Sequence, residues 1–385
     1  MSHLFPTYSR WELEPASAKG AKITAVDGKE YLDFTSGIGV CNLGHCHPQI
    51  ENAVCDQLKK FWHVSNLFPQ SNQEKAAKLL ADAAGLDLVF FANSGAEANE
   101  AALKLARKAT NRSKIISFYN SFHGRTFGSM AATGQDKIKK GFGPMLETFV
   151  HIPFNDIEAF LAEIDKDTAA VVLEVVQGEG GINLATPEFL TIVEKACKEL
   201  GTLLIIDEIQ TGIGRTGKPF AFQHFNLNPD IITVAKGLGS GFPIGAVVGK
   251  ADLQEAFGPG SHGSTFGGNP IAIAAAIATM EIIFDEQFLA KTTSTGTYLY
   301  DQIVKKIAKL DGLVDIRGLG LIIGIEISGN ISEVLATLRS NGLIVLPAGE
   351  KVIRLLPPLN ITKDEVDQAV SLLENTLAKL TSAAI

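Results

Sequence analysis

Short apolar segments alternate with longer amphipathic ones through the middle of the chain. The apolar segments have the length and β-branched content of buried strands. They are LVFFANS (88–94), KIISFY (114–119), AAVVLEVV (169–176), LLIIDE (203–208) and IITVAK (231–236). Residues 72–84, 95–111 and 187–200 have the spacing of helices, and the last has a capping Thr186 before it and Gly201 after it. This alternation predicts an α/β fold in which helices cover a mostly parallel sheet.

The two ends of the chain follow other patterns. In AKITAVDGKEYLDF (21–34), alternation on both sides of Asp27-Gly28 predicts a β-hairpin with a type I′ turn. Strand patterns such as GLVDIRGLGLIIGIEI (312–327) precede a closing helix from Lys363, which indicates a smaller α+β domain. We expect the N-terminal segment to contribute to that domain. The expected parts are an N-terminal segment (1–70), a large domain (71–285) and a small C-terminal domain (286–385).

Composition and charge exclude several classes of protein. Hydrophobic residues make up 46% and charged residues 20% of the chain, as in an ordinary globular protein. The net charge of -8, with no basic stripe, argues against nucleic-acid binding. The Ala-rich apolar stretch 271–280 is too short to span a membrane, and the N-terminus lacks the apolar region of a secretory signal. The four cysteines have no disulfide-framework spacing, so we expect a reduced, cytoplasmic, enzyme-sized protein.

One short stretch, NLGHCHP (42–48), brings together His45, Cys46 and His47, all residue types that bind zinc. No second ligand cluster with suitable spacing follows it. We therefore expect no metal site, and a role for these residues in local structure.

Ligands in open α/β sheets collect at the carboxyl ends of the strands. The strand LVFFA runs into NSGAEANEAALK, where Ser94 and Glu97 have the spacing of a capping box. Gly95 and Ala96 are small enough for a phosphate to approach the free N–H groups of the first turn. Taken alone, this stretch also fits a well-capped helix without a ligand.

Two further strand ends carry ionisable side chains. Lys236 follows IITVA and precedes a glycine-rich turn, and partial burial there would make its amine a nucleophile toward carbonyls. A lysine that simply reaches solvent fits the same position. The turn GLGSG is not a dinucleotide fingerprint, because its spacing is wrong and a strand follows it. Asp207 ends the strand LLIID.

Together these strand ends match what pyridoxal 5′-phosphate (PLP) requires. Its phosphate needs a cradle, its aldehyde needs a lysine, and its ring nitrogen needs a carboxylate that keeps it protonated. The predicted phosphate site at Gly95 and Ala96, with Lys236 and Asp207, supplies one group for each requirement.

Seven motifs in the chain support the same interpretation as a set. They are NSGAEA (93–98), FHGRT (122–126), QGEGG (177–181), DEIQTG (207–212), AKGL (235–238), HGSTFGGNP (262–270) and IRLLPPL (353–359). With these motifs in this order, the sequence resembles the class III aminotransferases of PLP fold type I across nearly its full length. One departure is Val175, where many members of the family have proline.

The resemblance implies roles for further residues. Phe122 would stack on the cofactor ring, and Gln210 would approach its phenolic oxygen. Thr265 would reach the phosphate of the partner subunit's cofactor, which makes the enzyme a homodimer with shared active sites. Arg125 and Ser264 would contact the substrate.

Within the family the chain most resembles acetylornithine aminotransferases. These move the 5-amino group of N2-acetyl-L-ornithine to 2-oxoglutarate, giving N-acetyl-L-glutamate 5-semialdehyde and L-glutamate in arginine biosynthesis. Both substrates place a carboxylate at a similar distance from the reacting carbon, so one arginine, for which Arg125 is the candidate, can bind both. Glutamate has a second carboxylate, for which Arg354 is the candidate, with Glu179 neutralising Arg354 when acetylornithine is bound. Without the resemblance, Arg354 would fit a surface charge on an edge strand.

The substrate itself leaves alternatives open. Ornithine and 4-aminobutyrate aminotransferases share the seven motifs, and the same fold could also serve a binding protein without activity. Ile38 favours the acetylated donor, because ornithine aminotransferases usually have a tyrosine there that helps to hold the free α-amino group.

Overall fold

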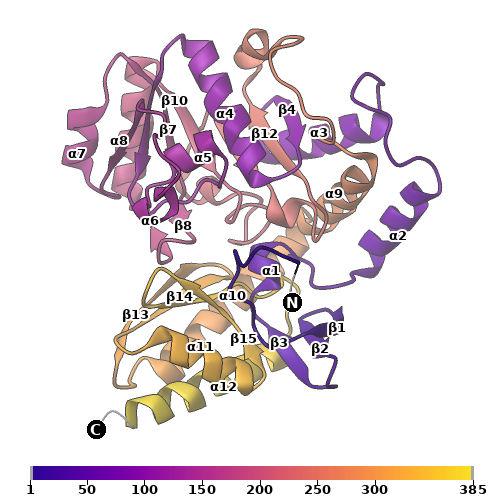
Figure 1. Ribbon diagram of the computed structural model, residues 1–385, viewed down its shortest axis with the longest axis vertical. Helices are drawn as coiled ribbons and strands as arrows, with labels where there is room; N and C mark the ends of the chain where they lie inside the picture. The colour runs from indigo at the N-terminus through magenta and orange to yellow at the C-terminus, as the bar shows by residue number, and fades with distance from the viewer. Residues whose placement is uncertain (1–2, 383–385) are drawn as a thin grey trace.

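The computed structural model describes residues 3–382. Its largest sheet has seven strands and fills the upper half of Figure 1. In spatial order these are β4 (Leu88–Ala92), β12 (Gly245–Gly249), β11 (Ile231–Val234), β10 (Leu203–Asp207), β7 (Thr168–Leu173), β5 (Lys114–Phe118) and β6 (Phe149–Ile152). β12 is antiparallel to both of its neighbours, and the other pairs in the sheet are parallel. The mostly parallel sheet predicted from the sequence is confirmed.

Helices cover both faces of this sheet. They are α3 (Ser71–Ala84), α4 (Gly95–Thr110), α5 (Phe127–Ala132), α6 (Asp136–Lys139), α7 (Ile157–Glu163), α8 (Pro187–Leu200) and α9 (Pro270–Ile283). Alternate residues of β10 face opposite ways: Ile205 packs in the core that contains α4, whereas Leu204 and Ile206 pack in the core that contains α3, α8 and α9. Burial on both faces explains why these strands are continuous apolar runs rather than alternating ones.

Several local predictions can be checked directly. Thr186 caps α8 by accepting from the Phe189 amide, and Gly201 ends the helix at φ +62°, as predicted. The Ala-rich segment forms the largely buried α9. No helix within residues 3–382 has the length and apolarity needed to cross a membrane.

Two local predictions are wrong. The hairpin of β2 (Lys22–Ala25) and β3 (Glu30–Asp33) forms, but its loop has three residues between Ala25 and Lys29. Only Gly28 of that loop has positive φ, at +83°, whereas a type I′ turn needs two such residues. The predicted strand 169–176 also divides after Leu173, because the chain turns there to form β8 (Val176–Gln177), which pairs with β9 (Asn183–Leu184).

The smaller sheets and the C-terminal helices lie in the lower half of Figure 1. One sheet has the order β13 (Leu313–Leu319), β14 (Ile322–Ile327), β17 (Val352–Leu355) and β16 (Leu346–Ala348). The helices with it are α10 (Glu286–Ile307), α11 (Ile331–Ser340) and α12 (Lys363–Ser382). The other sheet joins β1 (Pro15–Lys19), β2 and β3 to β15 (Leu343–Ile344), so the N-terminal segment and the C-terminal part share it as expected.

Further helical elements lie between those named above in the chain. They are α1 (Ser36–Gly39), α2 (Pro48–Leu58) and the short 3₁₀ helices η1 (Ala221–Phe225), η2 (Lys236–Leu238) and η3 (Ala251–Phe257). Domain boundaries at residues 70 and 285 stay a prediction, although α3 begins at Ser71 and α9 and α10 are separated by Phe284 and Asp285.

Candidate active site

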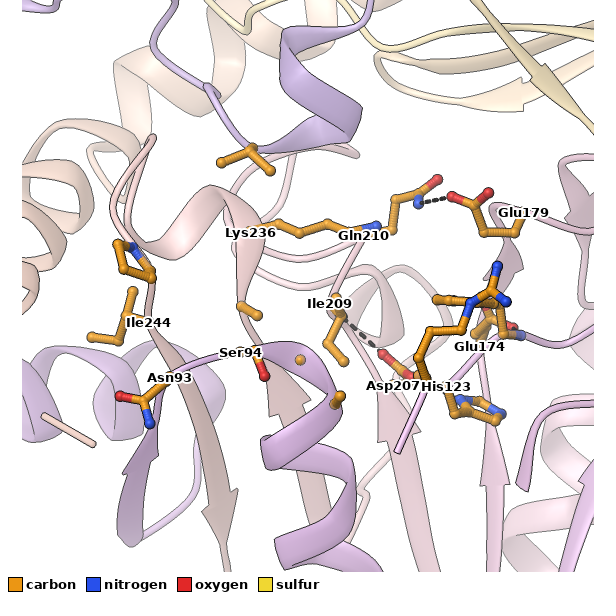
Figure 2. A pocket seen from close by; sticks show the side chains of 18 of the residues that line it. Asn93, Ser94, His123, Glu174, Glu179, Asp207, Ile209, Gln210, Lys236 and Ile244 are labelled. Carbon is orange, nitrogen blue, oxygen red and sulfur yellow. Dashed lines mark hydrogen bonds and ion pairs between the residues drawn. The ribbon is translucent and has the colours of Figure 1, made fainter. Parts of the chain in front are cut away.

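A cavity of about 420 Å³ opens where the large sheet meets the small sheets, at the carboxyl ends of β7, β10 and β11 (Figure 2). Eight of the residues predicted from the sequence line it, namely Gly95, Ala96, Phe122, Arg125, Glu179, Asp207, Gln210 and Lys236. They come from five separate stretches of the chain. This is the edge of a parallel sheet at which a ligand is expected.

The first turn of α4 forms one wall of the cavity. Ser94 Oγ accepts from the Glu97 amide at 3.2 Å, but the Glu97 carboxylate accepts from the Asn93 amide and not from that of Ser94. The predicted reciprocal capping box is therefore only half formed. The amides of Gly95 and Ala96 have no acceptor in the described part of the chain, and they point from the positive end of the helix dipole, where an anion is stabilised.

Close packing also restricts this turn to a small residue. A Cβ added to Gly95 would lie 2.8 Å from Ile209 Cδ1, a contact too short to be accommodated without movement. Glycine thus lets α4 begin directly beside the loop that follows β10.

Lys236 begins η2, two residues after β11, and its side chain extends into the cavity (Figure 2). Its φ of +44° is rare for a residue with a side chain, and such strain concentrates at functional sites. The Nζ atom has no hydrogen-bond partner among residues 3–382. Desolvation lowers the pKa of Lys236; the charge of Glu179 opposes this and that of Arg354 reinforces it. The result is a greater share of the neutral, nucleophilic amine.

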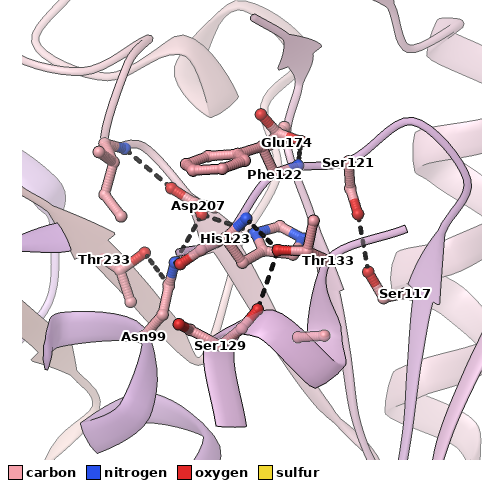
Figure 3. Close-up of polar contacts among 12 residues, drawn as sticks. Asn99, Ser117, Ser121, Phe122, His123, Ser129, Thr133, Glu174, Asp207 and Thr233 are labelled. Carbon is pink, nitrogen blue, oxygen red and sulfur yellow. Dashed lines mark hydrogen bonds and ion pairs between the residues drawn. The ribbon is translucent and has the colours of Figure 1, made fainter. Parts of the chain in front are cut away.

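Asp207 ends β10, and protein donors hold both of its carboxylate oxygens (Figure 3). Oδ2 accepts from His123 Nδ1 at 2.7 Å and from Asn99 Nδ2 at 2.8 Å, while Oδ1 accepts from the Ile209 amide at 3.0 Å. Thr233 Oγ1 in turn donates to Asn99 Oδ1 at 2.8 Å. These donors stabilise a carboxylate that is almost completely buried.

Sequence reasoning missed this support for Asp207. His123 is buried, and its Nε2 has no partner within the described chain. Burial alone would lower its pKa, but the hydrogen bond to Asp207 and the Asp207 charge raise it overall. His123 lies inside the FHGRT motif, which was the available signal. For Asn99, the sequence offered no signal beyond its position on the inner face of a predicted helix.

Glu174 is a third residue that sequence reasoning missed. It lies in the stretch where the predicted strand 169–176 divides, and its Oε2 accepts from the Phe122 amide at 3.1 Å. Desolvation, with smaller contributions from the charges of Asp207 and Glu179, raises its pKa to about 8, although nearby His123 opposes the shift. The neighbouring Val175 is fully buried, and its carbonyl accepts from the Ala185 amide at 2.9 Å, a bond that the family's proline would keep.

Arg354 belongs to β17, which lies between β14 and β16, and it is only 2% exposed, so a surface charge on an edge strand is excluded. Its Nη1 lies 2.5 Å from Glu179 Oε1 and 2.9 Å from Gln210 Oε1, and also donates to the Gly178 carbonyl. Gln210 Nε2 donates to Glu179 at 3.1 Å. Burial would raise the pKa of Glu179, but the charges of Arg354 and Lys236, with the hydrogen bonds from Arg354 and Gln210, together outweigh burial and lower that pKa to about 2.

Ser264 and Thr265 do not line the cavity of their own chain. Both lie in the loop before α9. Ser264 Oγ accepts from Asn93 Nδ2 at 2.9 Å, and Thr265 is exposed at the surface.

The NLGHCHP stretch has structural partners. His45 Nε2 lies 2.9 Å from Asp33 Oδ2; hydrogen bonds to Asp33 and to Cys41 raise the pKa of His45 to about 10. Within residues 3–382, no three His, Cys, Asp or Glu side chains are grouped closely enough to hold a metal ion.

The sequence matches the family model described as aminotransferase class-III over residues 7–377. Among curated proteins, it is 58% identical to the acetylornithine aminotransferase of Bacillus subtilis over 98% of both chains. It is 53% identical to the acetylornithine aminotransferase of Listeria monocytogenes serovar 1/2a, over 98% of this chain and 97% of that one.

Solved structures with the same fold include two kinds of aminotransferase. The ornithine aminotransferase of Toxoplasma gondii has a TM-score of 0.95 and 33% identity, over 99% of this chain and 94% of that one. The acetylornithine aminotransferase of Elizabethkingia anophelis has a TM-score of 0.87 and 33% identity, over 98% and 96% of the two chains. Another structure of the Toxoplasma enzyme is described with PLP partially occupying its active site.

Proposed function

The chain belongs to the class-III aminotransferase family, and we propose that it transfers the 5-amino group of N2-acetyl-L-ornithine to 2-oxoglutarate with the help of PLP. The products are N-acetyl-L-glutamate 5-semialdehyde and L-glutamate. Relatives that are 50–58% identical over nearly the whole chain carry the acetylornithine name, which supports this donor. The fold alone does not distinguish acetylornithine from ornithine as the donor, because the ornithine aminotransferase of Toxoplasma gondii has the same fold at 33% identity.

The residues of the cavity fit PLP. An unpartnered lysine amine, a hydrogen-bonded buried carboxylate and two free helix amides face one cavity of about 420 Å³, and this combination carries the proposal. Lys236 would hold the aldehyde, Asp207 the ring nitrogen, and Gly95 and Ala96 the phosphate. When bound, PLP supplies an electron sink for the carbon that loses its proton.

Other residues would orient that cofactor. Phe122 would cover one face of the ring, and Glu174 fixes the Phe122 backbone. Gln210 would approach the phenolic oxygen from the side of Glu179.

Lys236 also has a role in moving protons. With the donor amine bound, Lys236 Nζ would serve as a base beside the reacting carbon. It can take the proton from the carbon that carries the amino group of acetylornithine. Its lowered pKa suits this task, because a larger fraction of the amine is unprotonated at neutral pH.

Two arginines would bind the substrate carboxylates, and the second of them would be needed in only one half-reaction. Arg125 lines the cavity, where it can bind the carboxylate that both substrates share; its guanidinium lies over the Phe122 ring at 5.6 Å. Arg354 would bind the second carboxylate of glutamate or 2-oxoglutarate. With acetylornithine, which lacks that group, the ion pair with Glu179 keeps Arg354 neutralised.

A second copy of the chain would complete each site. Thr265 is exposed outside its own cavity, which suits a residue that reaches the phosphate bound by the partner, and Ser264 beside it would contact substrate. Apolar side chains nearby are also exposed, namely Leu58, Phe61, Trp62, Leu67, Phe68 and Phe266. A large exposed apolar patch is typical of an interface, and supports a homodimer.

The biological setting follows from the proposed reaction. Acetylornithine transamination belongs to arginine biosynthesis. All four cysteines are free, which fits a reducing compartment, and we place the enzyme in the cytoplasm.

A panel of single half-reactions tests the function. Purified enzyme with PLP is mixed separately with acetylornithine, ornithine and 4-aminobutyrate, and the cofactor spectrum is followed in time. We expect the fastest conversion with acetylornithine. A faster conversion with either other donor overturns the substrate, and no spectral change with any amine overturns the transaminase.

A further inference from the structure

Arg215 is the largest side chain that is completely buried, with 0% exposure. It lies in the loop after β10, eight residues beyond Asp207. No carboxylate among residues 3–382 forms an ion pair with it, and burial lowers its pKa to about 9. A buried cation without a counter-ion is costly unless its donors are well satisfied, so its contacts define what it does.

The guanidinium of Arg215 reaches across from the large sheet to the small one. Nη1 donates to the Leu321 carbonyl at 3.1 Å and to the Pro357 carbonyl at 2.5 Å. The Arg215 carbonyl accepts from the Leu321 amide at 3.0 Å, so that contact is made twice. Leu321 directly precedes β14, and Pro357 follows β17 by two residues. One side chain thus ties the loop after β10 to two neighbouring strands of the small sheet.

Arg215 also reaches the N-terminal segment through Asn42. Nη2 donates to Asn42 Oδ1 at 2.8 Å, and Asn42 Nδ2 donates to the Ile213 carbonyl at 2.8 Å. A Cβ added to Gly237 would lie 2.2 Å from Asn42 Nδ2, so Asn42 presses against the residue next to Lys236. The contacts of Arg215 therefore extend to the turn that carries the lysine.

We propose that Arg215 is a positioning residue that holds Arg354 in place relative to Gln210 and Lys236. Gln210 and Arg215 share one loop, and Arg354 and Pro357 lie three residues apart at the end of β17. Arg215 fixes Pro357 to the loop, while Arg354 Nη1 meets Gln210 Oε1 at 2.9 Å. With Arg215 removed, the segment that carries Arg354 loses its anchor to the loop.

The expected difference between the two half-reactions rests on the proposed function. Arg354 would bind the second carboxylate of 2-oxoglutarate and glutamate, whereas acetylornithine does not need it. A displaced Arg354 therefore harms one half-reaction and spares the other. A protein that lost only general stability would lose both half-reactions together.

The test compares Arg215→Lys with a matched control. Lysine keeps a cation but cannot donate to three acceptors in a planar fork. Arg112 also has three acceptors, the backbone carbonyls of Thr168, Leu200 and Gly201, but at the opposite end of the sheet. Arg112→Lys thus makes the same chemical change away from the cavity.

Steady-state kinetics should separate the two variants. We expect Arg215→Lys to raise KM for 2-oxoglutarate at least about tenfold, since small misplacements of a binding group cost one to two orders of magnitude. KM for acetylornithine should change less than about threefold in the same variant, and Arg112→Lys should leave the ratio of the two KM values unchanged. Equal changes in both KM values for Arg215→Lys, or the same ratio in both variants, would overturn the proposal.

Hydrogen exchange on the protein without substrate gives a readout that does not depend on the reaction. Peptides covering 208–217 and 352–359 should exchange faster together in Arg215→Lys and remain protected in Arg112→Lys. Unchanged exchange in both segments overturns the proposal even if the enzyme acts on another donor. Should Arg215→Lys fail to fold, Asn42→Ala removes one of the three acceptors of Arg215, together with the bond from Asn42 Nδ2 to the Ile213 carbonyl. The same two segments should then loosen to a smaller extent; no loosening there overturns the proposal as well.

Discussion

Arg354 Nη1 lies 2.5 Å from Glu179 Oε1, although the two residues are 175 positions apart in the chain. Gln210 supports this contact, because its Nε2 donates to Glu179 and its Oε1 accepts from Arg354. Glu179 lines the cavity that Lys236 enters (Figure 2), and Arg354 reaches Glu179 from β17 in the small sheet. Because the Glu179 pKa is lowered to about 2, the Glu179 carboxylate stays ionised at neutral pH, and a substrate carboxylate would compete with it for Arg354.

Glu179→Gln should change which substrate is preferred. The amide leaves Arg354 without a counter-ion, so a substrate with a second carboxylate is favoured over one that lacks it. We expect kcat/KM for glutamate relative to acetylornithine to rise at least about tenfold, or roughly 1.4 kcal/mol. Single-turnover measurements with each amine check this. Asp165→Asn, which weakens the exposed pair with Lys114, is the control, and an unchanged ratio in Glu179→Gln would contradict the switch.

Asp207→Ala should slow catalysis without unfolding the protein. It removes the carboxylate that would keep the cofactor nitrogen protonated, and we expect kcat to fall at least about a hundredfold at saturating PLP. Asp230→Ala is the matched control, because Asp230 pairs with Lys250 at 2.7 Å, at the amino end of β11, away from the cavity. A rate within threefold of wild type for Asp207→Ala would exclude this role.

The raised pKa of Glu174 predicts how the stability of the protein depends on pH. Its pKa is raised from 4.5 to about 8 by burial, so the folded protein favours the protonated form. The resulting stability is fully present below pH 4.5 and is lost as pH rises through about 8. Glu174→Gln cannot ionise, so its Tm should fall less than that of wild type between about pH 5 and 8. Parallel Tm curves for the two proteins in this window would show that Glu174 does not titrate there.

Hybrid dimers test whether the active sites are shared. Lys236→Ala and Thr265→Ala are each expected to be nearly inactive. If Thr265 serves the partner's site, a hybrid of the two has one site with both residues intact. Equal mixing should then restore about a quarter of wild-type activity, since half of the dimers are hybrids with one working site of two. No recovery, with subunit exchange verified by mass spectrometry, would argue that each chain forms its own site.

Ile38 bears on the choice between acetylornithine and ornithine. It lies in α1 at φ +70°, a strained conformation for a β-branched residue, and its side chain is 46% exposed. An apolar side chain there gives no partner to a free α-amino group, whose desolvation costs a few kcal/mol. We expect kcat/KM for acetylornithine to exceed that for ornithine at least about tenfold, and Ile38→Tyr to narrow the gap. Equal use of both donors by the wild-type enzyme would contradict the assignment of the donor.

Features that depend on neighbouring residues could be predicted from the sequence alone. Apolar runs such as LLIID became strands buried on both faces, and Thr186 and Gly201 set the ends of α8. The strand ends carrying Asp207 and Lys236 were also visible, because the parallel sheet places all such ends on one edge. These are consequences of local spacing and of the burial of apolar side chains.

The pairing of distant residues became visible with the three-dimensional fold. His123 forms a hydrogen bond with Asp207, 84 positions away in the chain. Glu179 pairs with Arg354, which lies in a strand of another sheet. Arg215 reads as an ordinary loop cation in the sequence, yet it is completely buried and bonded to backbone carbonyls that no pattern indicates. Even the short-range capping box is only half formed, because the Glu97 carboxylate accepts from the Asn93 amide instead of the Ser94 amide. Such contacts depend on the exact approach of separate elements, which the alternation of polar and apolar positions does not specify.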